Sequence, residues 1–497
     1  MTDEARDPAT PHAESDPSLE AGARAAKNTI AGAAGEIVGR LASLVLFAAV
    51  GRTVGEDGLG AFVFAVAYLQ IVMVPVDLGF DRYMTREVAR DRTNLDRMFF
   101  AILSLKGLLA VPILGISMLG LHLLGYGMEI QLTTLALTVG VFSDSVSRTL
   151  ASVFNAHEVV PPAAVSLVVQ RVAAAALGLA ALQAGFEVIG VAVTYTLGSL
   201  AGLCVGVVLF VRRIGLPRRD FARGSWRALS AKSIPFAVQD IFTVVLFKVD
   251  AVILSLIATQ SAVGIYGAAY RVFESTLFIS YALAGAFSAM YTYLDHDSEP
   301  TVGTVFARSI KLAVVVLTPT AIIFGVLARP LMEAIYGADF GAAAAPLELL
   351  APTVLLIGVV ILAGALVVSR SDPKSMIRIT AVMALLNIGL NFALIPSQGA
   401  AGAAGAMLVT EAAFAVVVVR MALAAGGELG LVRTLAGALI AAVPMAAVAL
   451  LLHEAFVPAL AASTAVYVVV LIAAERAISP ADLRFAVSML RERLRSR

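Results

Sequence analysis

Long apolar segments separated by short polar ones follow one another along almost the whole chain. A helix needs about 20 mostly apolar residues to cross the hydrocarbon core of a bilayer. The segments that approach or exceed this length are 28–50, 58–79, 98–122, 131–155, 161–183, 188–211, 233–256, 262–291, 309–328, 346–368, 378–396, 402–424, 434–453 and 457–475. The pattern therefore predicts an all-α polytopic membrane protein with about fourteen transmembrane helices.

Composition supports this class. Of the residues, 60% are hydrophobic and only 14% are charged, whereas about a quarter of the residues in soluble domains are charged. Cys204 is the single cysteine, which excludes a disulfide within the chain. We expect a multi-pass protein of the cytoplasmic membrane.

The distribution of Lys and Arg predicts the orientation. Cytoplasmic loops of membrane proteins collect basic residues. If the N-terminus is cytoplasmic, the inside segments and the span ends next to them hold 28 of the 36 Lys and Arg, the outside ones hold Arg52 and Arg329, and six lie deeper within spans. This asymmetry predicts fourteen helices with both ends of the chain on the cytoplasmic side.

The polar ends of the chain are predicted to lie in the cytoplasm. Residues 1–27 are polar, contain three prolines and lack a secretory signal, so we expect a disordered tail. Residues 476–497 place leucines opposite arginines at helical spacing, which predicts an amphipathic basic helix on the inner leaflet; a generic polybasic tail is the alternative.

No motif for catalysis is visible. HExxH, GxxxxGK[ST], CxxC and GxSxG are absent, and no predicted loop exceeds about 22 residues. The five histidines are scattered. We therefore expect a transporter rather than an enzyme, with no catalytic residue, no metal, no cofactor and no nucleic-acid partner.

An internal repeat predicts two lobes. A shift of 204 residues aligns Gly35-Glu36 with Gln239-Asp240 and lays Leu59-Gly60-Ala61-Phe62 over Val263-Gly264-Ile265-Tyr266. Parallel repeats of this kind build several transporter folds. We expect a lobe of six helices over 28–211, a basic cytoplasmic linker over 212–232, a second six-helix lobe over 233–424, and two further helices within 425–475.

Six cationic side chains lie within the predicted spans. A charge near the bilayer centre costs roughly 2.5 to 3.5 kcal/mol on insertion scales, so such residues face a protein interior or a wet cavity and mark a transport pathway. Their positive sign indicates an anionic cargo. They are Arg40, Lys106, Arg148, Arg171, Lys248 and Arg271.

Three segments resemble a known family. They are VDAVILSLIATQSAVGIYGAAYRVFES at 249–275, YGADF at 336–340 and LNIGLNFALIPSQGAAGAAGA at 386–406. Their order and spacing resemble the polysaccharide biosynthesis flippases of the multidrug/oligosaccharidyl-lipid/polysaccharide exporter superfamily, to which the MATE transporters belong. The resemblance implies a V-shaped pair of lobes around a cavity and translocation of a polyprenyl-diphosphate-linked oligosaccharide. Its relatives leave two alternatives: an ion-coupled multidrug exporter and a lipid II flippase.

The charges fit such a cargo. A diphosphate that leaves headgroup water needs cationic partners, and arginine is a planar, multidentate one. We expect the six cations to line a central cavity and hold the diphosphate during alternating access. The partners are then the lipid-linked glycan, the bilayer and possible glycan assembly or polymerisation machinery, and we expect a monomer.

Local ion pairs are the alternative role for three arginines. Glu36 and Arg40, and Asp144 and Arg148, are spaced i, i+4, and Arg271 and Glu274 are spaced i, i+3, so each pair could neutralise itself along one helix face. Arg171 and Lys106 have no acid within a helical turn. Their charges need a partner from another helix, water or the cargo.

Acidic residues within the spans are candidates for ion coupling or for holding the arginines in place. They are Glu36, Asp144, Asp240, Glu274 and Glu411. Asn387 and Asn391, spaced i, i+4, are expected to make interhelical hydrogen bonds.

Overall fold

The computed structural model describes residues 17–218, 225–294, 301–370 and 373–478. The first half of the chain forms α1 (Pro17–Asp77), α2 (Phe80–Arg90), α3 (Asn94–Leu123), α4 (Met128–Ala156), α5 (Pro161–Gln183) and α6 (Val188–Arg213). The second half forms α7 (Ser225–Ile257), α8 (Gln260–Glu274), α9 (Leu277–Tyr293), α10 (Val302–Val326), α11 (Ala328–Tyr336), the 3-10 helix η1 (Ala338–Ala343), α12 (Ala344–Arg370), α13 (Pro373–Ala424), α14 (Leu431–Leu451) and α15 (Phe456–Ile478).

The all-helical fold predicted from hydropathy is confirmed. Most residues of each of the fourteen predicted spans are helical. Two helices, α1 and α13, each hold two spans that reverse direction at a glycine with positive φ, Gly55 at 78° and Gly399 at 54°. Glycine occupies this region without a steric penalty, so a helix can turn back there without a long loop.

Nine helical stretches in the described part of the chain are long and apolar enough to cross a membrane, and four of them contain two consecutive helices or helical arms. The helix α4 and the helix α7 are not among the nine. Both carry charged residues, among them Asp144 in α4 and Asp240 in α7. The predicted span 262–291 is divided into α8 and α9 at Ser275 and Thr276.

The disordered tail expected over residues 1–27 stays a prediction, and the described part of the chain begins inside this range. Helix α1 begins at Pro17, because proline is favoured in a first helical turn and this segment is rich in alanine, the strongest helix former. Residues 1–16 and the predicted helix within 479–497 lie outside the described residues. The segment between α6 and α7 is shorter than the predicted linker 212–232, because α6 ends at Arg213 and α7 begins at Ser225.

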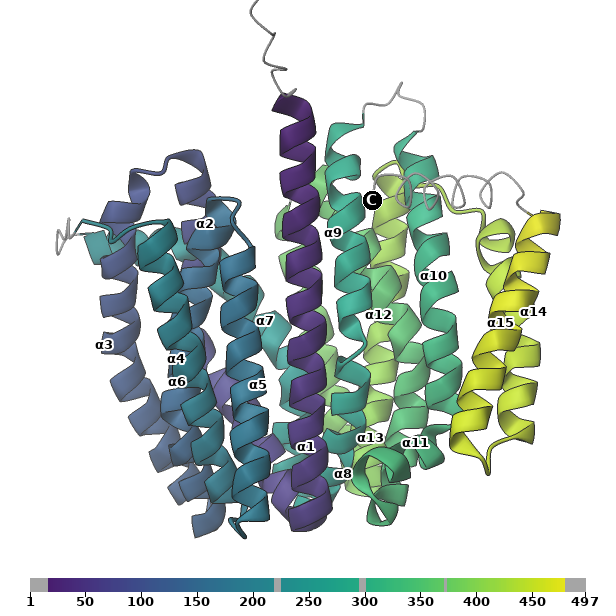
Figure 1. Cartoon of the computed structure of the whole chain (residues 1–497), viewed down its shortest axis with the longest axis horizontal. Coiled ribbons are helices and arrows are strands. Elements are labelled where there is room, and N and C mark those ends of the chain that lie inside the picture. The colour runs from purple at the N-terminus through teal and green to yellow at the C-terminus, as the bar shows by residue number, and fades with distance from the viewer. Residues whose placement is uncertain (1–16, 219–224, 295–300, 371–372, 479–497) are drawn as a thin grey trace, which may run out of the picture.

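The helices form two groups, which we also call the first and second lobes. The first lobe holds α1 to α6 and the second holds α7 to α13, and they meet along α1. In Figure 1, α2 to α6 stand on one side and α8 to α13 on the other, and α14 and α15 lie at the far edge. Helix α1 packs on α7 and α8, and its second arm meets α8 at Gly60 and Val63. We call the end of the bundle that carries the start of α1 the upper end, as drawn in Figure 1, and the opposite end the lower end.

Repeat-related glycines meet at the lower end. A Cβ atom built on Gly60 would lie 2.1 Å from the carbonyl oxygen of Gln260, and one built on Gly264 would lie 2.0 Å from that of Glu56. Each contact maps onto the other by the 204-residue shift. The two groups of helices therefore touch about a local two-fold axis, and the backbone approach leaves room only for glycine.

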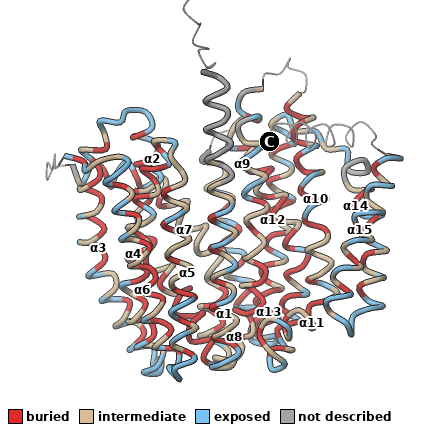
Figure 2. Tube along the Cα trace, in the orientation of Figure 1, coloured by how far each residue is buried: buried red, intermediate tan, exposed pale blue. Residues whose placement is uncertain are grey.

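Large apolar side chains cover the outside of the bundle. Val111, Leu123 and Leu451 are 76%, 75% and 82% exposed, and Figure 2 shows exposed and intermediate residues along the outward faces of the long helices. Apolar surface of this extent marks a membrane or protein interaction surface. This is the surface expected of a multi-pass membrane protein.

Candidate functional site

A cavity of about 260 Å³ lies between the two groups of helices. We call it the central cavity. Its wall comes from α1, α5, α6, α8 and the residue after α8, and consists of Glu36, Gly39, Arg40, Ser43, Phe47, Val66, Gln70, Leu167, Arg171, Tyr195, Arg271, Glu274 and Ser275. Three of the predicted arginines therefore reach one space.

Glu274 is the carboxylate around which several cations gather. Its two carboxylate oxygens accept from Lys248 Nζ at 2.8 Å and from Arg271 Nη1 at 2.9 Å. Its backbone carbonyl accepts from Arg40 Nη1 at 2.6 Å, and Arg40 also pairs with Glu36 at 3.2 Å. The predicted pairs Glu36 with Arg40 and Arg271 with Glu274 are thus confirmed.

Arg271 and Lys248 also lie against aromatic rings. The Arg271 guanidinium is 3.6 Å from the centre of the Phe47 ring on α1, and Lys248 Nζ is 5.0 Å from that of Tyr270. A cation over an aromatic face is attracted by the ring quadrupole. The contact with Phe47 holds an α8 arginine against the other group of helices.

Arg171, from α5, is bonded to a neutral hydroxyl, whereas Arg40, Arg148 and Arg271 each pair with a carboxylate. Its Nη1 lies 3.3 Å from the hydroxyl oxygen of Tyr195, and that hydroxyl donates to Asp144 at 3.0 Å. No ion pair joins Arg171 directly to a carboxylate among the described residues. Its guanidinium is therefore available to a further anion, as its sequence neighbourhood predicts.

A second cavity of about 440 Å³ opens beside the first, between α1, α4 and α5. We call it the side cavity. It shares Glu36, Leu167 and Arg171 with the central cavity, and it adds Asp144 and Arg148 from α4. The two cavities therefore adjoin at Arg171.

The predicted pair of Asp144 with Arg148 is wrong. Arg148 Nη2 instead binds Asp77, at the end of α1, at 2.6 Å, and Asp144 accepts hydrogen bonds from Gln170 and Tyr195. The i, i+4 spacing allows such a pair, but partners from neighbouring helices compete for both charges.

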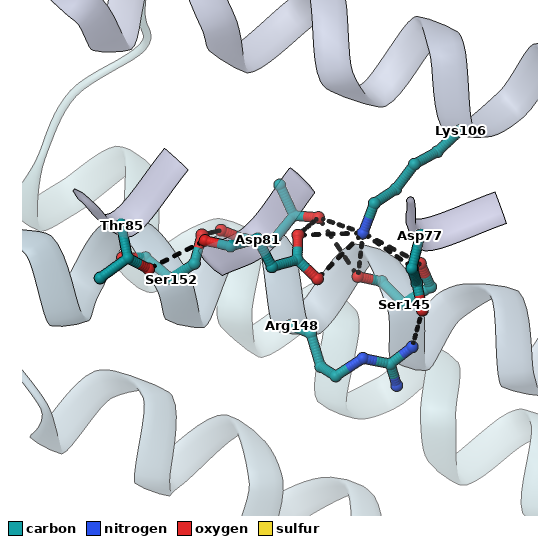
Figure 3. Close-up of polar contacts among 8 residues, drawn as sticks. Asp77, Asp81, Thr85, Lys106, Ser145, Arg148 and Ser152 are labelled. Carbon is teal, nitrogen blue, oxygen red and sulfur yellow. Dashed lines mark hydrogen bonds and ion pairs between the residues drawn. The ribbon is translucent and has the colours of Figure 1, made fainter. Parts of the chain in front are cut away.

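Lys106 lies inside the first group of helices. Its side chain is completely buried, and Nζ is 2.9 Å from Asp77 and 3.0 Å from Asp81. Ser145 and Thr149 on α4 complete its surroundings, at 3.1 and 2.8 Å (Figure 3). In this conformation Lys106 lines neither cavity, because one carboxylate from α1 and one from α2 hold it.

The positive charge in the cavities exceeds the negative charge. A small pocket next to Phe47 adds Lys248. The walls of this pocket and of the two cavities carry five basic and three acidic side chains, an excess of two positive charges. They are Arg40, Arg148, Arg171, Lys248 and Arg271, against Glu36, Asp144 and Glu274.

Asp240 is not placed as the counterpart of Glu36. It forms an ion pair of 2.9 Å with Arg82 of α2, toward the upper end, and lines none of these cavities. The pair joins the two groups of helices on the side opposite Gly60 and Gly264.

A buried polar cluster lies in the second group of helices. Asp250 of α7 accepts from Tyr266 at 2.8 Å and from Asn391 at 2.7 Å, and Asn391 also bonds Asn387 at 3.0 Å. The predicted interhelical bond is confirmed for Asn391, whereas the bond of Asn387 lies within α13. Glu411 is also buried, and its Oε2 has no partner among the described residues.

Asp250 was not predicted as a site residue. It lies two residues after Lys248 and is 1% exposed. The sequence does contain a signal for it, namely an acid in one apolar span and an asparagine pair in another. A buried carboxylate needs hydrogen-bond donors, and the asparagine side chains can supply them.

Comparison with known proteins identifies the family. A family model described as polysaccharide biosynthesis protein matches residues 25–291. The chain belongs to this family. It is also 25% identical over 369 residues to the probable low-salt glycan biosynthesis flippase Agl15 of Haloferax volcanii, a match that covers 73% of this chain and 76% of that protein.

Solved structures show the same fold at lower identity. The lipid II flippase MurJ in an inward closed conformation aligns with a TM-score of 0.72 at 14% identity, over 90% of this chain and 98% of that one. An inward-facing MATE multidrug transporter aligns with a TM-score of 0.64 at 14% identity, over 78% and 94%. This polysaccharide biosynthesis family member therefore has the fold of the MOP superfamily, as predicted.

Proposed function

We propose that the protein flips a polyprenyl-diphosphate-linked oligosaccharide across the cytoplasmic membrane by alternating access. The observation that carries the proposal is the excess of two positive charges on the cavity walls. A diphosphate esterified at both ends carries two negative charges at neutral pH. The family and the glycan flippase relative support the glycan part of this cargo.

The cavity can replace the water that a diphosphate loses. Removing an ionised group from water is costly unless it is paired and hydrogen-bonded. Arg40, Arg171 and Arg271 present several N–H donors to one space, and hydrogen bonds between guanidinium and phosphate are about twice as strong as neutral ones. The partly apolar side cavity offers room next to this charge for the remainder of the cargo.

The charge balance also separates the alternatives. Export of cationic drugs requires a cavity with excess acid, and the excess here is basic. A lipid II flippase would carry the same lipid diphosphate with a different sugar portion. The cavity charge supports a lipid diphosphate in general, and the glycan biosynthesis relative favours an oligosaccharide.

The upper end is proposed to face the cytoplasm. The ends of α2 and α6, which carry Arg90 and Arg213, and the turn after α2, which carries Arg92, lie at this end, and such residues collect on the cytoplasmic side. The contact of Gly60 with Gly264 then closes the outer side, and Arg82 with Asp240 joins the lobes on the inner side.

The buried cluster of Asp250 and Glu411 is the proposed ion-coupling site, in place of Asp240. A buried carboxylate without a partner favours uptake of a proton or a cation. Glu411→Gln should keep the fold but make flipping insensitive to a proton or sodium gradient, measured in proteoliposomes with an imposed gradient. Unchanged gradient dependence in the variant would exclude Glu411 from coupling.

A complementation experiment tests the proposed cargo site. In a strain that lacks the gene, Arg171→Gln should express normally but lower glycan export about tenfold to a hundredfold, the loss expected for one charge-assisted hydrogen bond. Lipid-linked glycan should then accumulate in the inner leaflet. Arg92→Gln, at an exposed position outside the cavities, is the matched control; normal export by both variants would contradict the proposal.

A further inference from the structure

The link between α1 and α2 is a strained hinge. Leu78 has a φ of 44° and Gly79 a φ of 68°, and a leucine rarely adopts the left-handed region. Strained residues of this kind persist only where surrounding contacts hold them, and they often lie at moving parts. A Cβ on Gly79 would lie 2.4 Å from the backbone nitrogen of Ala237 on α7, so the hinge touches the second lobe directly.

Two carboxylates flank this hinge and are held from one side by Lys106. Asp77 ends α1 and Asp81 lies in the first turn of α2. Lys106 bridges them from α3, and Thr149 donates to Asp81 at 2.7 Å (Figure 3). Because Lys106 is completely buried, this part of the network is closed to cargo.

Arg148 is held differently. It reaches the hinge through one acid, Asp77, at 2.6 Å, and its side chain is 51% exposed and lines the side cavity. Asp77 therefore has two cationic partners, of which Lys106 is enclosed and Arg148 faces the space that adjoins the central cavity.

We propose that Asp77 is a positioning residue that competes with the anionic cargo for Arg148. This inference rests on the proposed function, because it requires a diphosphate to enter the cavities. In this structure Asp77 neutralises Arg148. When a diphosphate takes Arg148, Asp77 keeps its bonds to Lys106 and Ser145.

The exchange connects the cavity to the contact between the lobes. With Arg148 engaged by cargo, Asp77 and Asp81 share Lys106 as their remaining ion-pair partner, which leaves one excess negative charge at the hinge. The hinge packs on α7 next to Asp240, itself an acid paired with Arg82. Like charges repel more strongly in a partly buried setting, so occupancy of the cavity loosens the contact of α2 with α7.

The test is the affinity of the purified full-length protein for inorganic diphosphate, measured by calorimetry. Asp77→Asn keeps the size of the side chain but frees Arg148, and should tighten binding at least about tenfold, as expected when one charge-assisted hydrogen bond no longer competes. The gain should vanish in the double variant Asp77→Asn with Arg148→Gln. Asp81→Asn, which removes the other hinge carboxylate without touching Arg148, is the control and should not tighten binding.

Hydrogen exchange of the unmodified protein provides a measurement that does not depend on how the variants fold. Addition of diphosphate should speed exchange of the backbone amides of α2. This inference alone would be overturned if diphosphate binds and neither Asp77→Asn nor Arg148→Gln changes its affinity. It would also be overturned if binding leaves the hydrogen exchange of α2 unchanged. Failure of the unmodified protein and every variant to bind diphosphate would instead contradict the proposed function.

Discussion

At the scale of single residues, the partners of each buried cation decide its role. Lys248, Arg40 and Arg271 gather around Glu274, Lys106 is enclosed by Asp77 and Asp81, and Arg171 has only a tyrosine hydroxyl. The first three are held in place while still facing the cavities. Arg171 is the one whose charge is least compensated.

Lys106 is predicted to act on stability rather than on cargo. Lys106→Gln leaves Asp81 without its cation and Asp77 with Arg148 alone, and breaking a buried ion pair by removing one partner costs about 3 to 5 kcal/mol. We expect a lower melting temperature in detergent and reduced protein levels. Restoring neutrality with Asp81→Asn in the same chain should recover part of the stability. A Lys106→Gln protein of normal stability that fails to bind diphosphate would show a direct cargo role instead.

Sequence reasoning identified the cavity cations but not all their partners. An unpaired charge in an apolar span is visible from the sequence, because its cost is local. The partner is not, because it comes from another helix. Asp77 lay at the end of the predicted span 58–79 and Asp81 in the following loop, so neither was connected to Lys106, and Asp144 was assigned to Arg148 by spacing alone.

At the scale of helices, the length of the apolar segments predicted where the spans lie but did not predict the local backbone geometry. Most residues of each of the fourteen spans are helical. The separation of α2 from α1 depends on positive φ at Leu78 and Gly79, and the break between α8 and α9 at Ser275 and Thr276 contains neither proline nor glycine. Packing against neighbouring helices determines both features, so hydropathy could not reveal them.

The glycine contact at the lower end yields a prediction for helix packing. Gly264→Ala would place a methyl group against the backbone of Glu56 and Gly60, so the lower ends of the lobes should move apart. Spin labels at Glu187→Cys and Asp339→Cys, in a Cys204→Ser background, should report longer distances. Gly115→Ala, where a Cβ meets no atom within 4 Å, is the matched control. Identical distance distributions for both variants would show that this contact does not close the lower end.

At the scale of the whole molecule, the repeat-related contacts and the positively charged cavity lie between the same two lobes. The lobes meet through repeat-related glycines at the lower end, through Arg82 and Asp240 toward the upper end, and around a cationic cavity between them. Contacts at both ends of a central site are what alternating access requires, because one end must separate while the other holds.

The most direct test of the central claim is a flipping assay in proteoliposomes that contain a fluorescent polyprenyl-diphosphate-linked oligosaccharide. The unmodified protein should move this lipid between leaflets, and the triple variant with Arg40, Arg171 and Arg271 changed to Gln should not, while circular dichroism shows the same helix content. Flipping at the unmodified rate by the triple variant would contradict a cationic cavity that carries the diphosphate.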